Sequence, residues 1–344
     1  MIIDIHGHYT TSPGELTAYR EKQIAWMGDR RTARPDPPVI SDQEIADSIE
    51  RNQLRLMDER GEDVMLISPK ASGMEHHRPD RSVARDWARV GNDLVHRVAG
   101  LFPGRFAAVC QLPQTPGGSL VEPILELRRC VEELGFVGCN LNPDPSGGFW
   151  TAPPLTDEFW FPLYEVMTEL DVPAMIHVSS SDNPAVDTLG GHYLNADTTV
   201  FMQLVAGDLF ARFPSLRFVI PHGGGAVPYH WGRFEGLATR LGRPPLRDHV
   251  LGNVYFDTCV YHQPGVDLLA RVMPADNVLF ASEIIGAVQD IDPETGHHFD
   301  DTRRYIDAVP WLSADDRAKI FETNARRVYP RLDGWFELHG VHPP

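Results

Sequence analysis

The sequence predicts an α/β protein, a (β/α)₈ barrel of the TIM type, in one domain that spans residues 1–344. Two observations lead to this prediction. Eight short apolar stretches alternate with helical stretches, and strands separated in this way pair in parallel. A doubly wound open sheet is the alternative, but no glycine-rich phosphate motif follows the first strand, which favours the barrel.

The first predicted strand begins at Met1 and ends in His6-Gly7-His8. The remaining strands are predicted at residues 64–67, 106–111, 136–141, 174–178, 216–220, 254–256 and 277–280. Helices are predicted at 41–60, 82–101, 118–134, 157–170 and 198–212. Ser41 and Glu44 have the spacing of a capping box and predict where the first of these helices begins. The polar stretch 11–40 is predicted to be a loop insertion, with a role in function or in oligomer formation.

The composition excludes several classes of protein. A formal net charge of −17 argues against binding to nucleic-acid phosphates or to anionic membranes. No apolar run approaches the length of a membrane span, and the chain starts directly with a strand, so we expect a cytoplasmic protein. The four cysteines lack C-x-x-C spacing, which favours core packing over disulfides. We also expect a homo-oligomer, a dimer.

Residues suited to metal binding follow four of the predicted strands. His6 and His8 alternate along the first strand and therefore point the same way. His177, His222 and Glu283 follow the fifth, sixth and eighth strands. In a barrel these strand ends meet at the face where active sites form, so the repeated placement indicates one site. Three imidazoles and a carboxylate suit Zn²⁺, although Mn²⁺ or Fe²⁺ also accept such ligands.

These residues resemble those of the amidohydrolase superfamily. Within it, the stretches 220–234 (IPHGGGAVPYHWGRF) and 256–264 (FDTCVYHQP) are similar to the branch of metal-dependent non-oxidative decarboxylases and 4-oxalomesaconate hydratases. Glutamate at position 283, where the decarboxylases usually carry aspartate, resembles the hydratase pattern.

The resemblance implies that His6, His8, His177 and Glu283 bind one zinc ion, while His222 stays off the metal and contacts water or substrate. Glu283 then accepts a proton from water that adds to a C=C bond conjugated to a carbonyl. The implied reaction is hydration of 4-oxalomesaconate, or of a close unsaturated oxo-polycarboxylate, in aromatic ring-cleavage catabolism.

The predicted substrate-binding residues also lie near strand ends. They are Lys70, Asn142, Tyr193 and Asn195. Hydratases of this branch usually carry arginine at the position of Lys70 and a second arginine where this chain has Gln289. Arginine binds a carboxylate through two hydrogen bonds and lysine acts as a point charge, so these differences leave the identity of the acid open.

Three other readings of the same residues remain. A decarboxylase of an aromatic or dienoic acid would release CO₂, which separates it from a hydratase. A hydrolase of an amide or lactone is less favoured because the bridging lysine of two-metal members has no evident counterpart. A metal-binding protein without catalysis would leave no metal position open to water.

Overall fold

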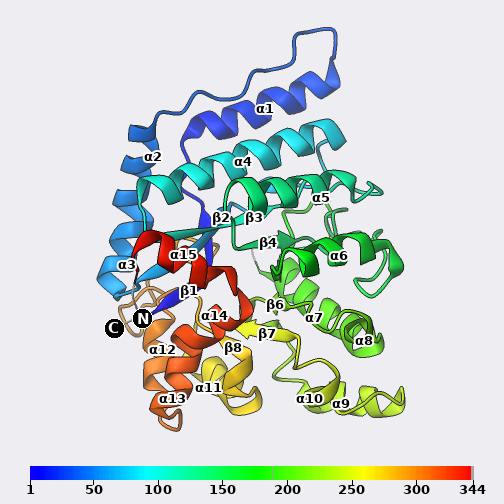
Figure 1. The fold of residues 1–344 in the computed structure, drawn as a ribbon, viewed down its shortest axis with the longest axis vertical. Coiled ribbons are helices and arrows are strands. Elements are labelled where there is room, and N and C mark those ends of the chain that lie inside the picture. The colour runs from blue at the N-terminus through cyan, green and yellow to red at the C-terminus, as the bar shows by residue number, and fades with distance from the viewer. Residues whose placement is uncertain (189, 342–344) are drawn as a thin grey trace.

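The computed structural model describes residues 1–188 and 190–341, and in these ranges eight strands form one parallel sheet in chain order (Figure 1). The strands are β1 (Ile3–Tyr9), β2 (Val64–Pro69), β3 (Phe106–Gln111), β4 (Gly138–Leu141), β5 (Ala174–Ile176), β6 (Phe218–Ile220), β7 (Val254–Asp257) and β8 (Val278–Leu279). The backbone N–H of Ile5 donates to the carbonyl oxygen of Phe280 at 3.1 Å, which joins β1 to the segment after β8. The predicted (β/α)₈ barrel is confirmed.

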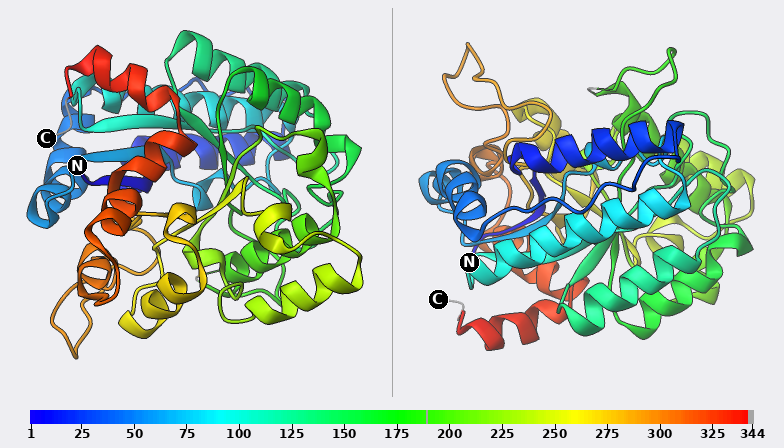
Figure 2. Two further views of the ribbon diagram at one scale, coloured as in Figure 1. Left: turned by 60° about the horizontal axis from the view of Figure 1, so that its bottom comes forward. Right: turned by 90° about the horizontal axis from the view of Figure 1, so that it is seen from above.

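Helices surround the sheet in both views of Figure 2. They are α1 (Gly14–Gly28), α2 (Asp42–Ile49), α3 (Arg55–Arg60), α4 (Arg81–Leu101), α5 (Val121–Arg128), α6 (Phe161–Glu169), α7 (Gly191–Ala206), α8 (Leu209–Arg212), α9 (Trp231–Arg240), α10 (Leu246–His249), α11 (Gln263–Val272), α12 (Arg303–Ala308), α13 (Ala314–Ala318), α14 (Asn324–Val328) and α15 (Arg331–His339). A π-helical turn at Glu50–Leu54 joins α2 to α3, so the helix predicted at 41–60 is continuous. Ser41 and Glu44 form the predicted capping box. No helix of the described ranges has both the length and the apolar character needed to cross a membrane.

The core has two layers, because successive side chains of a strand point to opposite faces. Val64 and Leu66 of β2 belong to a cluster inside the barrel, whereas Met65 and Ile67 pack in the layer between strands and helices. The inner cluster also contains apolar side chains of the last two helices. They are Ala325 and Val328 of α14, Leu332, Trp335 and Phe336 of α15, and Tyr329 between the two helices. These two helices therefore close the end of the barrel where the strands begin.

Two helices differ from the prediction. The stretch 11–40, predicted as a loop insertion, contains α1, which lies along α4 (Figures 1 and 2). Its buried residues are Leu16, Tyr19 and Gln23. Because the buried face includes a polar residue, the sequence shows only a weak apolar pattern at helical spacing. The helix predicted near 198 begins at Gly191, without a capping side chain to mark its start.

Candidate active site

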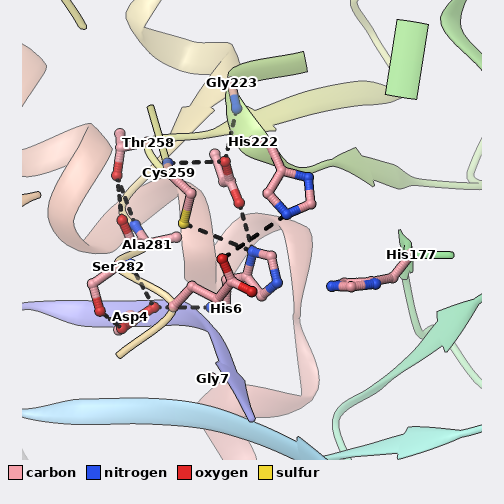
Figure 3. A network of polar contacts seen from close by, with 12 residues as sticks. Asp4, His6, Gly7, His177, His222, Gly223, Thr258, Cys259, Ala281 and Ser282 are labelled. Atoms are coloured by element: carbon pink, nitrogen blue, oxygen red, sulfur yellow. Dashed lines mark hydrogen bonds and ion pairs between the residues drawn. The ribbon is translucent and has the colours of Figure 1, made fainter. Parts of the chain in front are cut away.

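The imidazoles of His6, His8 and His177, here called the histidine cluster, meet at the end of the barrel where the strands finish. The Nε2 atoms of His6 and His8 lie 3.1 Å apart, and those of His8 and His177 lie 3.2 Å apart. Figure 3 shows the side chains of His6, His177 and His222 pointing toward one another. The structure thus brings together histidines from three strands that the sequence placed at strand ends.

An irregularity in β1 aims its two histidines. Asp4 pairs with Met65 while Gly7 pairs with Ile67, so β1 carries one more residue than β2 over this interval. Such bulges redirect side chains and are common beside active sites. A Cβ atom on Gly7 would lie 2.4 Å from the Met65 sulfur and 2.9 Å from the Leu66 carbonyl oxygen. Only glycine therefore fits between the histidines.

The outer nitrogen of each ring determines its tautomer. Nδ1 of His177 lies 2.7 Å from the carbonyl oxygen of Val178, which can only accept a hydrogen bond. Nδ1 of His6 lies 2.8 Å from Oδ2 of Asp257. Although burial opposes it, the hydrogen bond from His6 lowers the pKa of Asp257, so this carboxylate also accepts. Both rings carry their proton on Nδ1 and present the Nε2 lone pair inward.

His8 follows the same arrangement. Its Nδ1 lies 2.7 Å from the hydroxyl of Ser68, and that oxygen also accepts a hydrogen bond from the Asn140 side chain. The Ser68 hydroxyl donates to the carbonyl oxygen of Gly7 or Pro69, which leaves its lone pairs for His8 and Asn140. His8 therefore also turns a lone pair toward the cluster.

The histidine cluster fits a metal ion. Burial, followed by the neighbouring histidines, lowers the pKa values of His8 and His177 well below the usual range, which keeps both rings neutral. Lone pairs at 3.1–3.2 Å repel one another unless a cation lies between them. Outer hydrogen bonds to carboxylate or carbonyl oxygens are the usual support of metal-binding histidines.

Glu283 and His222 complete the set of ligand atoms. One ligand atom from each of His6, His177, His222 and Glu283 lies within 4.8 Å of the other three. Nε2 of His222 is 4.0 Å from Oε2 of Glu283, and the Tyr261 hydroxyl donates to the same oxygen at 2.6 Å. The geometry therefore allows His222 to bind the ion as well, and its predicted place off the metal stays a prediction.

Asp197 of α7 orients His222, because its Oδ2 lies 2.9 Å from Nδ1 of the imidazole. Burial raises the pKa of Asp197 to about 6, against the effect of the neighbouring imidazole. Burial alone would lower the pKa of His222, but the Asp197 carboxylate raises it to about 9. The pair is therefore a buried carboxylate beside an imidazolium at neutral pH, with Nε2 directed at Glu283.

The backbone at this end of the barrel adopts an uncommon conformation. His222, Tyr261 and Glu283 have φ values of 53°, 64° and 54°, in the left-handed region that favours glycine. Ile285, a β-branched residue, has a φ of 58°. Residues held in this region concentrate at functional sites, where the surrounding structure enforces them.

A cavity of about 730 Å³, here called the site cavity, adjoins the histidine cluster. Its lining includes His8, His177, His222 and Glu283, the predicted substrate residues Lys70 and Tyr193, and Gln289. The segments that follow β5 and β8 project from the same side of the barrel in Figure 2 (right). This volume suits a small organic acid.

The structure does not bring Asn142 or Asn195 to the lining of the site cavity. The Asn142 side chain is buried and occupied by His76, at 2.9 Å, and by Ser179, at 3.3 Å. Asn195 lies exposed on α7, which also carries Tyr193.

The sequence reasoning missed the residues that hold the ligands in place. Asp257 is the last residue of β7, so the strand-end rule that found the histidines applies to it as well. Tyr261 and Asp197 carry no such signal, since each reaches its partner only through the tertiary fold.

Comparison with known proteins agrees with this geometry. The sequence profile of a family described as amidohydrolase matches residues 3–331. A 2-keto-4-carboxy-3-hexenedioate hydratase of Sphingobium sp. is 58% identical over 343 residues, 99% of each chain. The crystal structure of a 4-oxalomesaconate hydratase from Rhodopseudomonas palustris is 56% identical and superposes with a TM-score of 0.92, covering 99% of each chain. A gamma-resorcylate decarboxylase of Rhizobium sp. is 30% identical and covers 83% of this chain and 88% of its own.

Proposed function

The chain belongs to the amidohydrolase family, and we propose that it is a metal-dependent hydratase that adds water to the C=C bond of an unsaturated oxo-tricarboxylate. The proposed substrates are 4-oxalomesaconate and 2-keto-4-carboxy-3-hexenedioate, the acids for which two relatives are named, in the catabolism of aromatic compounds. The observation that carries the proposal is the convergence of three inward-facing histidine nitrogens beside the Glu283 carboxylate, at a cavity of about 730 Å³.

We propose that His6, His8, His177 and Glu283 hold one zinc ion. Three neutral nitrogen donors and one carboxylate are a ligand set that zinc takes, and that Mn²⁺ and Fe²⁺ also accept. When bound, such an ion supplies Lewis acidity, which makes water more acidic and polarises a carbonyl group.

Glu283 is the proposed general base. Tyr261 donates to its Oε2, so the other carboxylate oxygen is free to take a proton from the attacking water. Burial, followed by the Glu283 charge, raises the pKa of Tyr261 well above its usual range, which keeps this hydroxyl a donor. In 2-keto-4-carboxy-3-hexenedioate, whose C=C bond is conjugated to the ketone, the water oxygen bonds to the alkene carbon that is β to the ketone, and the π electrons move to the ketone oxygen as an enolate.

His222, Lys70 and Gln289 are the proposed partners of the negative charges on the enolate oxygen and the substrate carboxylates. Asp197 occupies Nδ1 of His222, so Nε2 is the atom that donates to the developing enolate oxygen. Lys70 supplies a cation for a substrate carboxylate, and Gln289 supplies a neutral amide. A proton delivered to the carbon α to the ketone then completes the addition of one water molecule.

The test uses purified protein loaded with zinc, mixed with 4-oxalomesaconate. Ultraviolet loss of conjugation should accompany formation of the hydrated acid, without CO₂. Removing the metal with a chelator should abolish turnover, and adding back one equivalent should restore it. Full activity in protein shown by elemental analysis to be metal-free would overturn the metal-dependent mechanism.

The decarboxylase alternative has weaker support, from a relative that is 30% identical. It predicts one CO₂ released for each molecule of an aromatic or dienoic acid consumed, with loss of one carboxylate. Stoichiometric CO₂ from such an acid, without hydration of either oxo-tricarboxylate, would replace the hydratase proposal.

A further inference from the structure

A second cavity, here called the side cavity, lies next to the site cavity and has a volume of about 470 Å³. Thr10 and Lys70 line both cavities, so they form the shared wall. The side cavity lies between α1 and α4, which run side by side in Figures 1 and 2. Its other walls include Leu16, Arg20 and Ile24 of α1, and Trp87, Gly91 and Leu94 of α4.

Arg20 faces this cavity without an ion pair to an acidic side chain, and the acidic charge that acts on it from nearby is that of Glu75. Its Nη1 donates to the carbonyl oxygen of Gly73 at 2.6 Å, and its Nη2 lies 3.8 Å from the Met74 sulfur. Its buried Nε has no hydrogen-bond partner. The guanidinium carbon lies 5.2 Å from the centre of the Trp87 ring, which fixes its plane. Within residues 1–188 and 190–341, no carboxylate forms an ion pair with Arg20.

Lys70 approaches Arg20 from the shared wall. A Cβ atom on Gly73 would lie 2.7 Å from Nη1 of Arg20 and 3.8 Å from Cδ of Lys70, so both cationic side chains converge on this glycine. The side chain of Lys70 has no hydrogen bond or ion pair with another residue of the described ranges, although its backbone carbonyl oxygen accepts a hydrogen bond from Gly73. The Lys70 ammonium is therefore a second cation at this wall that is free to bind an anion.

The other charged residues of the side cavity are already paired or exposed. Glu75 lies 3.2 Å from Arg78, which also pairs with Asp182 at 2.7 Å. Glu21 is exposed on α1. Arg20 is therefore the partly buried charge of this cavity that lacks an ion pair, while Lys70 and Glu21 are exposed charges of opposite sign at its edge.

We propose that the side cavity is a binding site for a carboxylate group, with Arg20 as its fixed cation and Lys70 shared with the site cavity. A guanidinium with free N–H groups matches a carboxylate, and the side chains of Leu16, Trp87 and Leu94 can cover the attached carbons. The carboxylate belongs either to the far end of the oxo-tricarboxylate or to a second small acid. The first source rests on the proposed function, whereas the second does not.

Binding is measured by calorimetry on zinc-loaded protein, with propane-1,2,3-tricarboxylate and with succinate as non-reacting probes. We expect Arg20→Met to weaken the binding of at least one probe about ten- to a hundredfold, because a charge-assisted contact is lost. Arg89→Met is the matched control, since Arg89 is exposed on the same α4 that lines the cavity but is not part of its lining. The control should bind both probes as the wild type does.

A second variant tests the site without removing the charge. Gly73→Ala places a methyl group against the Arg20 guanidinium and narrows the cavity, so it should also weaken binding. If Arg20→Met fails to fold, as judged by its thermal unfolding, this variant decides the question. Unchanged affinity for both probes in a folded Arg20→Met protein, or in Gly73→Ala in its place, would overturn the proposal.

Kinetics separates the two sources of the carboxylate. If the group belongs to the substrate, Arg20→Met raises KM with little change in kcat, and succinate competes with substrate. If it belongs to a second acid, KM measured without succinate is unchanged and the effect of succinate on turnover disappears in the variant. One further outcome separates the two proposals. If the wild type hydrates neither oxo-tricarboxylate but Arg20→Met weakens probe binding, the proposed function is overturned and the carboxylate site is supported.

Discussion

The two ends of the barrel are built from the same strands but serve different purposes. β1 contributes Ile3 and Ile5 to the inner apolar cluster and, one and three residues after Ile5, His6 and His8 to the histidine cluster. Apolar side chains of α14 and α15 fill the end where the strands begin, whereas the other end opens into the site cavity. Stability and chemistry are therefore separated along each strand, and substitutions at one end should change one property and spare the other.

The sharpest test of this separation is Glu283→Gln. We expect kcat to fall at least about a thousandfold, because the amide cannot take a proton from water. The free energy of unfolding of the metal-free protein should stay within about 0.5 kcal/mol of wild type, since an amide oxygen still accepts from Tyr261. Steady-state kinetics and denaturant unfolding measure both. A kcat within tenfold of wild type would exclude Glu283 as the base.

The converse test is Leu332→Ala at the closed end. Leu332 is fully buried in the inner cluster, so its truncation should lower the free energy of unfolding by about 3 kcal/mol. The kcat of the folded protein should not change. Leu338→Ala on the same α15 is the control, because Leu338 is 79% exposed and should leave stability as it is. A large loss of kcat in folded Leu332→Ala would show that the two ends are coupled.

His222→Asn distinguishes two roles within the open end. We expect kcat to fall about a hundredfold while zinc content, measured by elemental analysis, stays near one per chain. His222 has a ligand atom within 4.8 Å of those of His6, His177 and Glu283, so the opposite result is informative. Zinc content that falls together with kcat would identify His222 as a ligand.

The smallest expected effect concerns the acid that the open end prefers. Lys70 and Gln289 both line the site cavity, at the two positions where the resemblance to hydratases leads us to expect arginine. A Lys70→Arg, Gln289→Arg double variant should raise kcat/KM for 4-oxalomesaconate about tenfold if the wild type favours another acid. A wild type that is already fast and gains nothing would show that the missing arginines are not needed. Lys22→Arg on the exposed side of α1 is the control.

Sequence patterns predicted the histidines at the open end of the barrel better than the residues that hold those histidines in place. Strand alternation located β3 at its observed bounds, and the strand-end rule found each histidine of the histidine cluster. The same rule also selected Asn142, whose side chain contacts His76 and Ser179, so its predicted role in substrate binding stays a prediction.

Contacts that depend on distant segments escaped prediction. Asp197 reaches His222 from a helix 25 positions away in the chain. Helix α1 buries Gln23, which bonds to Trp87 and Asp86 of α4, so its buried face looked polar in the sequence. Local periodicity carries no information about such tertiary partners.

The left-handed backbone of the open end bears on how this protein can be engineered. A non-glycine residue in that conformation costs about 1 kcal/mol or more, and a β-branched side chain such as that of Ile285 suits it least. Ile285→Asn would place there a residue that tolerates the conformation, although Ile285 also lines the site cavity. Laboratory selection for heat resistance should therefore accept changes at this position early, and selection for turnover should reverse them.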